Sequence, residues 1–269
     1  MENCADIAIV GAGILGLAHA WAAARRGMRV VVFERGSHAA GASVRNFGLI
    51  WPIGQPHGAM HEMVLRSRST WLEVLDDARL PYWPTGSMHL AYRNDEAAVA
   101  REFAERAPKF GYDCAWLKPD EVVARSSAVR CDGLIGGLWS PLEVTVDPRV
   151  VLASLPGYLQ QRYGVQVRFG CAARGIDLPL IEAGNERWRV ERAIICSGDD
   201  FESLFPQVYK QSGLTRVKLQ MLRTVPQMDG WRLGPALAAG AHTALLPFVP
   251  DLRNASRAAP PDCVRDTGV

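Results

Sequence analysis

Three glycines near the N-terminus constrain the fold of this chain more than any other feature. Gly11, Gly13 and Gly16 follow the apolar run Ile7–Val10, and a second apolar run ends at the acidic residue Glu34. In such a unit the first glycine allows a sharp turn, the second lets the backbone approach a pyrophosphate, and the third lets a helix pack closely on a strand. The carboxylate accepts hydrogen bonds from ribose hydroxyls. The spacing therefore predicts a strand, a helix and a second strand that together bind a dinucleotide.

Two other interpretations of this segment are open. A tight turn between a strand and a helix uses glycines without binding any ligand. A secretory signal peptide is disfavoured, because it needs a basic start and an uninterrupted apolar core. This chain has Glu2 and Asp6 before the run and glycines within it. We therefore expect no export signal.

Composition and charge exclude several classes of protein. The chain has 269 residues, of which 48% are hydrophobic and 22% charged, as in a soluble globular protein that buries a core. A net charge of +2 is too small to indicate nucleic acid as a partner. No long uncharged apolar run predicts a membrane span. The six cysteines form no CxxC pair, which predicts neither zinc nor a dithiol site but free thiols in the cytoplasm.

Apolar periodicity and turn residues place the expected elements. Helices are expected at 15–26, 60–78, 96–109 and 148–163, the last with Asp147 as its N-cap and Gly164 at its end. Strands are expected at 29–33, 87–92, 165–169, 172–176, 192–196 and, in a second layer, 214–225. The fold class is therefore predicted as α/β, with an α+β insertion between two parts of the nucleotide-binding domain.

Four sequence blocks together resemble the D-amino-acid oxidase/sarcosine oxidase family of flavoproteins. They are residues 9–16 with Glu34 and Arg35, residues 41–50, residues 146–152 and residues 192–198. Within that family, residues 41–56 are similar to a subgroup associated with aminophosphonate breakdown. Their order along the chain makes the resemblance more specific than any single block.

The resemblance implies a Rossmann-like FAD-binding domain of the glutathione-reductase type with an inserted α+β substrate domain. We expect the FAD-binding domain at 1–80 and 145–212 and the substrate domain at 81–144 and 213–246. It also implies oxidation of a C–N bond by hydride transfer to flavin, with oxygen as acceptor and a small amine as substrate. A nicotinamide-dependent dehydrogenase is the alternative, because the glycine unit serves that cofactor equally well.

Candidate site residues follow from the same blocks. Non-covalent FAD is expected to contact Gly11, Gly13, Ile14, Leu15, Gly16, Glu34, Arg35, Ala42, Ser43, Asn46, Gly48, Ala173, Cys196, Ser197 and Gly198. Arg45 is a candidate for steadying reduced flavin or a substrate acid group. His57 is a candidate pocket residue, and Arg223 a candidate cation on the strand expected at 214–225. Surface, turn and loop positions are the competing interpretations of Arg45, Asn46 and His57.

The C-terminal part departs from the family pattern. Members of the family continue for about another hundred residues, in keeping with a two-domain build. Here the periodic pattern stops near Leu246, and residues 247–269 are expected to be a disordered tail. On this ground the chain is expected to be truncated, marginally stable and poorly active, and an inactive nucleotide-binding remnant is a further alternative. The oligomeric state is left open.

Overall fold

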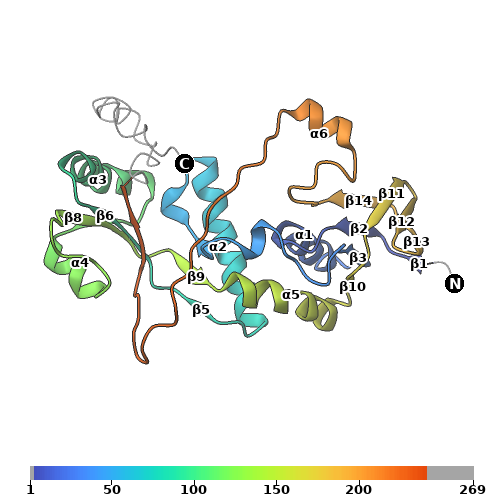
Figure 1. Cartoon of the computed structure of the whole chain (residues 1–269), viewed down its shortest axis with the longest axis horizontal. Helices are drawn as coiled ribbons and strands as arrows, with labels where there is room; N and C mark the ends of the chain where they lie inside the picture. Colours follow the sequence, from blue (N-terminus) through green and yellow to red (C-terminus); the bar gives the residue numbers. More distant parts are fainter. Residues whose placement is uncertain (1–2, 241–269) are drawn as a thin grey trace. The chain divides into compact units, whose positions relative to one another are not determined.

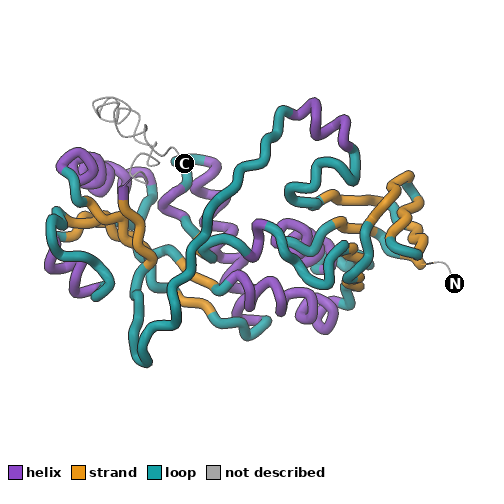
Figure 2. The backbone as a smooth tube through the Cα atoms, in the orientation of Figure 1, coloured by secondary structure: helices purple, strands orange, loops and turns teal. Residues whose placement is uncertain are grey.

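The computed structural model describes residues 3–240, which divide into two compact units. The first unit contains residues 3–48, 77–80 and 147–224, and the second contains residues 49–76, 81–146 and 225–240. Figure 1 shows the elements in chain order, and Figure 2 separates helix, strand and loop. The division differs from the expected one in that residues 49–76 group with the second unit and residues 213–224 with the first.

A parallel sheet forms the centre of the first unit. Its order is β10 (Gln166–Arg168), β3 (Val30–Phe33), β2 (Ile7–Val10) and β14 (Arg192–Ile195). All four residues of β2 and all four of β3 are buried, as expected for inner strands of a parallel sheet. Helix α1 (Ile14–Ala24) contacts β2, β3 and helix α5 (Pro148–Tyr163). The predicted strand–helix–strand unit is confirmed.

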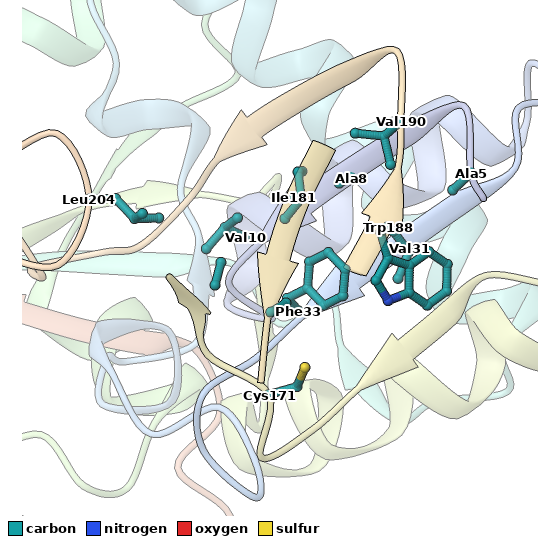
Figure 3. Close-up of a cluster of buried hydrophobic side chains, with 12 residues drawn as sticks. Ala5, Ala8, Val10, Val31, Phe33, Cys171, Ile181, Trp188, Val190 and Leu204 are labelled. Carbon is teal, nitrogen blue, oxygen red and sulfur yellow. The ribbon is translucent and has the colours of Figure 1, made fainter. Parts of the chain in front are cut away.

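A second sheet of the first unit packs on the parallel one. Its order is β1 (Asn3–Cys4), β13 (Glu186–Arg189), β12 (Leu180–Ala183) and β11 (Ala173–Asp177). Between the two sheets lies a buried cluster in which Phe33 and Trp188 meet edge to face, with ring centroids 5.7 Å apart (Figure 3). Strands β12 and β13 were not expected from the sequence, although Gly184 with a φ of 57° marks the turn between them.

The second unit is built on a mixed four-stranded sheet and a smaller antiparallel one. The larger has the order β15 (Ala236–Ala239), β6 (Ser87–Ala91), β8 (Gly136–Ser140) and β7 (Ala115–Leu117). The smaller has the order β4 (Leu49–Ile50), β9 (Val144–Val146) and β5 (Tyr82–Trp83). Helices α2 (Ala59–Asp77), α3 (Asn94–Arg106) and α4 (Pro119–Arg125) complete it. This mixture agrees with the expected α+β insertion.

The strand expected at 214–225 is wrong. After α6 (Pro206–Ser212) the chain has no regular structure until β15, which pairs in parallel with β6. The apolar residues of the expected strand are exposed, with Val217 at 78% and Leu222 at 88%. Alternating residues form a strand only where a neighbouring strand completes the backbone hydrogen bonds, and none within residues 3–240 pairs with this segment. The tail expected at 247–269 lies outside the described residues.

Helix α5 begins and ends as its sequence predicts. Asp147 is the N-cap, and its side chain accepts a hydrogen bond from the Arg149 N–H at 2.9 Å. Pro148 occupies the first turn, where its missing N–H costs no hydrogen bond. Gly164 ends the helix in the left-handed conformation with a φ of 68°. These signals position the helix that leads into β10.

Removing the N-cap of α5 tests how much the local signal contributes. Asp147→Ala leaves the first-turn N–H without its acceptor, so we expect the free energy of unfolding to fall by about 1 kcal/mol. Asp147→Asn keeps an oxygen acceptor and serves as the control, with a change of only a few tenths of a kcal/mol. Urea unfolding followed by circular dichroism measures both. Equal losses in the two variants would contradict the capping role.

Candidate functional site

The glycine turn after β2 approaches the neighbouring backbone too closely for any side chain. Gly11 has a φ of 103°, and a Cβ there would overlap the carbonyl group of Cys196. A Cβ on Gly16 would overlap the carbonyl oxygen of Gly11. The turn therefore requires glycine at both positions, the first for its conformation and its contact with Cys196, the second for the packing of α1 on the turn.

The N-terminus of α1 offers backbone N–H groups to an anion. Gly13 is the N-cap and supplies no side-chain cap, and the first turn of the helix holds no acidic residue. The Ser43 hydroxyl oxygen accepts a hydrogen bond from the Ile14 N–H at 3.0 Å. Unpaired N–H groups and the helix dipole together favour a phosphate at such a place. Leu15 is 67% exposed beside this turn.

The Glu34 carboxylate is held at the end of β3 by two backbone hydrogen bonds. Its Oε2 accepts from the Ala12 N–H and its Oε1 from the Gly36 N–H, both at 2.9 Å. A carboxylate has about four acceptor positions, so both oxygens retain a lone pair for ribose hydroxyls. The backbone of Glu34 also bonds to Arg168 and Cys171, which fixes β3 against the segment after β10.

Residues 41–48 form a compact turn next to the start of α1. The short 3₁₀ helix η1 (Ala42–Val44) carries Ser43, and Arg45 follows it with an exposed side chain. The Asn46 amide donates to the carbonyl oxygens of Ala42 and Ser43, and its Oδ1 accepts from the Gly48 N–H at 2.7 Å. These bonds agree with the turn interpretation of Asn46, while its contact with FAD stays a prediction.

The return strand brings Cys196 to the glycine turn. The Cys196 N–H donates to the Val10 carbonyl oxygen at 2.8 Å, and burial raises the pKa of its thiol. The thiol is therefore protonated at neutral pH and serves as a small packing group. Ser197 donates from its hydroxyl to the Asp200 carbonyl oxygen at 3.2 Å, and Gly198 follows with a φ of 66°. Ala173 is buried in the core between the two sheets.

Two predicted catalytic residues belong to other segments than those described so far. His57 belongs to the second unit, where it is exposed and packs against Phe110 with ring centroids 4.9 Å apart. Arg223 lies in the irregular segment before β15 and is exposed, so its expected position on a strand is wrong. Arg45 lies in the first unit, two residues after Ser43. Their catalytic roles stay predictions.

Two acidic residues that make polar contacts with residues distant in the sequence were not predicted from the sequence. Asp200 forms an ion pair with Arg35, the residue after Glu34, at 2.7 Å. Glu143 is fully buried in the second unit, where its carboxylate accepts from the Ile53 N–H at 3.0 Å and the Ser87 hydroxyl at 3.1 Å. Burial raises the pKa of Glu143, and these hydrogen bonds oppose that rise. Both contacts join residues distant in sequence, so no local pattern indicates them.

A fit to a dinucleotide follows from the groups of the first unit. The glycine turn, the start of α1 and the Glu34 carboxylate lie at the carboxyl ends of parallel strands, where open α/β sheets bind ligands. Gly13 has no side chain to block the approach to the helix start, the helix start suits a diphosphate and the carboxylate suits a ribose. These residues therefore fit the ADP half of FAD.

Comparisons with known proteins agree with this geometry. A family model described as FAD dependent oxidoreductase matches residues 6–253. The bifunctional protein ThiO/ThiG of Nostoc sp. is 25% identical to this chain. The similar region covers 83% of this chain and 35% of that protein. The thiamine thiazole synthase of Thermococcus kodakarensis is 27% identical over 89% of this chain and 87% of its own length. The structure of glycine oxidase from Geobacillus kaustophilus superposes with a TM-score of 0.68 at 21% identity, covering 77% of this chain and 59% of that one.

Substituting Gly13 tests the phosphate end of the site. A Cβ at Gly13 would lie 3.1 Å from the Ser43 hydroxyl oxygen, and valine would add two methyl groups at the helix start. We expect Gly13→Val to weaken FAD binding by more than about tenfold, because the diphosphate loses its close approach to the backbone. Flavin absorbance after gel filtration measures the retained cofactor.

Gly157 supplies the matched control for this test. It lies in α5 of the same unit, and a Cβ there meets nothing within 4 Å. Gly157→Val should leave the flavin content unchanged. A Gly13→Val protein with as much flavin as the Gly157→Val protein would contradict the assignment of the glycine turn.

Acidification should destabilise the second unit through His61. This side chain is 4% exposed and stacks on Tyr112 with ring centroids 4.0 Å apart. Burial, and then the charge of His57, lowers the pKa of His61 from its usual 6.5. The folded state therefore disfavours the protonated ring, so the contribution to stability is complete above pH 6.5 and falls as the pH drops towards the folded-state pKa.

The slope of stability against pH measures this contribution. Urea unfolding between about pH 7.5 and 5 should give a shallower decline for His61→Gln than for the unchanged protein. His19→Gln is the control, because His19 is exposed on α1. The idea fails if the His61 and His19 variants decline with the same slope as the unchanged protein.

Proposed function

Because the chain belongs to the family of FAD dependent oxidoreductases, we propose that it oxidises the C–N bond of a small amine that carries an acid group, with oxygen as electron acceptor. The observation that carries the proposal is the arrangement of the first unit. The glycine turn, the start of α1 and the oriented Glu34 carboxylate meet at one edge of the parallel sheet. Family membership favours FAD over the nicotinamide alternative.

The residues of the chain have separate tasks in this proposal. Bound FAD supplies the acceptor for a hydride from the carbon next to nitrogen. The N–H groups at the start of α1 orient the diphosphate, and Glu34 orients the ribose. Arg45 carries the cation nearest in sequence to Ser43, and it either steadies a reduced, anionic flavin or meets the acid group of the substrate.

An aminophosphonate is the finer form of the proposed substrate. Residues 41–56 support it through their resemblance to a subgroup associated with aminophosphonate breakdown. A phosphonate dianion favours bidentate contact with a guanidinium, which Arg45 offers. Glycine oxidase and an L-amino acid deaminase are among the similar solved structures, so amino acids are the wider class.

This chain spans only part of the length of several similar proteins, so their complete activities do not transfer to it directly. It spans 35% and 26% of the first two curated relatives and 59% of the glycine oxidase structure. The activity of the whole protein is therefore part of the proposal. Within residues 3–240 no helix is both long and apolar enough to cross a membrane. We place the reaction in the cytoplasm, where the described cysteines, none of which forms a disulfide, stay reduced.

A second candidate function comes from one sequence relative. The thiamine thiazole synthase of Thermococcus kodakarensis matches this chain over nearly the full length of both proteins. The second candidate is therefore the synthesis of a thiazole precursor of thiamine. Expression of this chain in a strain that requires the thiazole for growth tests it directly. Growth without added thiazole would favour this function over amine oxidation.

Anaerobic reduction of the bound flavin tests the amine proposal. We expect glycine, sarcosine, 2-aminoethylphosphonate or its N-methyl derivative to bleach the flavin absorbance, because each carries an oxidisable C–N bond and an acid group. Admission of oxygen should restore the colour and release peroxide. Propan-2-ol and NADH are the controls and should leave the flavin oxidised. Bleaching by NADH or the alcohol, and by none of the amines, would move the protein to another reaction class.

A further inference from the structure

An ion pair joins the two chain segments on either side of the glycine turn. Strands β3 and β14 are the neighbours of β2 in the parallel sheet, and their last residues align with the last residue of β2. Arg35 follows β3 and Asp200 follows β14. The Arg35 Nη1 lies 2.7 Å from the Asp200 Oδ2. The pair therefore links the ends of the two strands that flank the nucleotide-binding turn.

Asp200 is fixed before it meets the guanidinium. Its Oδ1 accepts hydrogen bonds from the N–H groups of Glu202 and Ser203, at 3.2 Å and 3.0 Å. Its carbonyl oxygen accepts from the Ser197 hydroxyl. The side chain of Asp200 is only 10% exposed, whereas that of Arg35 is 62% exposed. The carboxylate is thus held by the backbone around it, whereas most of the arginine side chain is exposed.

Arg35 is in turn coupled to the ribose end of the site. It follows Glu34 directly, and Glu34 bonds through its carboxylate to Ala12 in the glycine turn. On the other side, Cys196 and Ser197 precede Asp200 and touch the turn at Gly11. Strand β2 thus lies between β3 and β14, and at the carboxyl edge of the sheet the ion pair connects the segments that follow these two outer strands.

We propose that the Arg35–Asp200 ion pair is a clasp that holds the flanks of the nucleotide site at a fixed separation and so slows the release of FAD. A site whose flanks are already in place loses less conformational freedom when it binds a rigid ligand. Breaking the clasp lets the Glu34 side move away from the Ser197 side. Arg35 and Asp200 are positioning residues in this scheme, and neither needs to touch the cofactor.

The inference goes beyond amine oxidation and depends only on FAD binding. If no amine reduced the flavin, the amine-oxidation proposal would fail, but the proposal about FAD release would still stand. Two other roles for the same pair make different predictions. If Arg35 exchanges Asp200 for a cofactor phosphate, removal of Asp200 frees the guanidinium and tightens binding. If the pair only stabilises the fold, its removal lowers the stability of the flavin-free protein and leaves the release rate unchanged.

The same sheet offers a matched control at its opposite edge. Arg29 and Asp6 precede β3 and β2, and the Arg29 Nη2 lies 2.6 Å from the Asp6 Oδ1. The Arg29 side chain is 67% exposed, close to the value for Arg35. In both pairs the aspartate also accepts backbone N–H groups, so an Asp→Asn substitution removes the charge while leaving an oxygen acceptor. Asp6→Asn and Arg29→Gln therefore test an ion pair of similar geometry away from the glycine turn.

The experiment compares release of FAD from Asp200→Asn, Arg35→Gln and the double variant with release from the two control variants. Holoprotein is diluted and the recovered fluorescence of free flavin gives the dissociation rate. Thermal unfolding of the flavin-stripped proteins gives the stability of the fold itself. We expect each clasp variant to release FAD about three to ten times faster, and the double variant to be within about twofold of the faster single variant, since both changes break one contact.

The controls separate the clasp from a general effect on stability. Asp6→Asn and Arg29→Gln should lower the melting temperature of the stripped protein at least as much as the clasp variants, and leave the release rate unchanged. Slower release from Asp200→Asn would overturn the clasp in favour of exchange with a phosphate. Unchanged release from both clasp variants, or additive effects in the double variant, would overturn it as well.

Discussion

The approach of the glycine turn to the carbonyl group of Cys196 sets the geometry of the whole nucleotide-binding unit. No side chain fits between Gly11 and this carbonyl, so β2 and β14 stay in parallel register up to Val10 and Ile195. Gly16 repeats the constraint between α1 and the turn. Because the helix then starts directly above the strand ends, its free N–H groups face the same edge as the Glu34 carboxylate.

The second unit depends on a contact of a different kind. A buried carboxylate is costly unless donors surround it, and Glu143 receives the Ile53 N–H together with the hydroxyls of Ser87 and Ser140. These donors come from η2 (Pro52–Gly54), β6 and β8, three segments without a common local pattern. Glu143 thus fastens the segment after β4 to the main sheet. The first unit joins its segments through glycines that lack a side chain, and the second joins them through one buried carboxyl side chain.

Sequence reasoning succeeded where the signal is local. The glycines, the helix behind them and the acid after β3 lie in one continuous stretch, and the cap of α5 lies within three residues. It failed at 214–225, because alternation describes a strand and not its partner. Strands β12 and β13 escaped notice because neither is a continuous apolar run, unlike the equally short β2 and β3. The partnership of Arg35 and Asp200 requires the strand order of the sheet, which no spacing reveals.

The two edges of the parallel sheet have different roles: the amino edge stabilises the fold, and the carboxyl edge is available for nucleotide binding. At the amino edge, Asp6 accepts both the backbone N–H and the guanidinium of Arg29, and so closes the start of β2 against β3. At the carboxyl edge, Glu34 keeps lone pairs available and α1 receives no cap from its own N-cap residue Gly13, which lowers the stability of the empty fold. An ion pair at that edge can offset part of this loss of stability. It leaves the nucleotide site open only if it joins the segments after β3 and β14 beyond the glycine turn. Arg35 and Asp200 occupy that position.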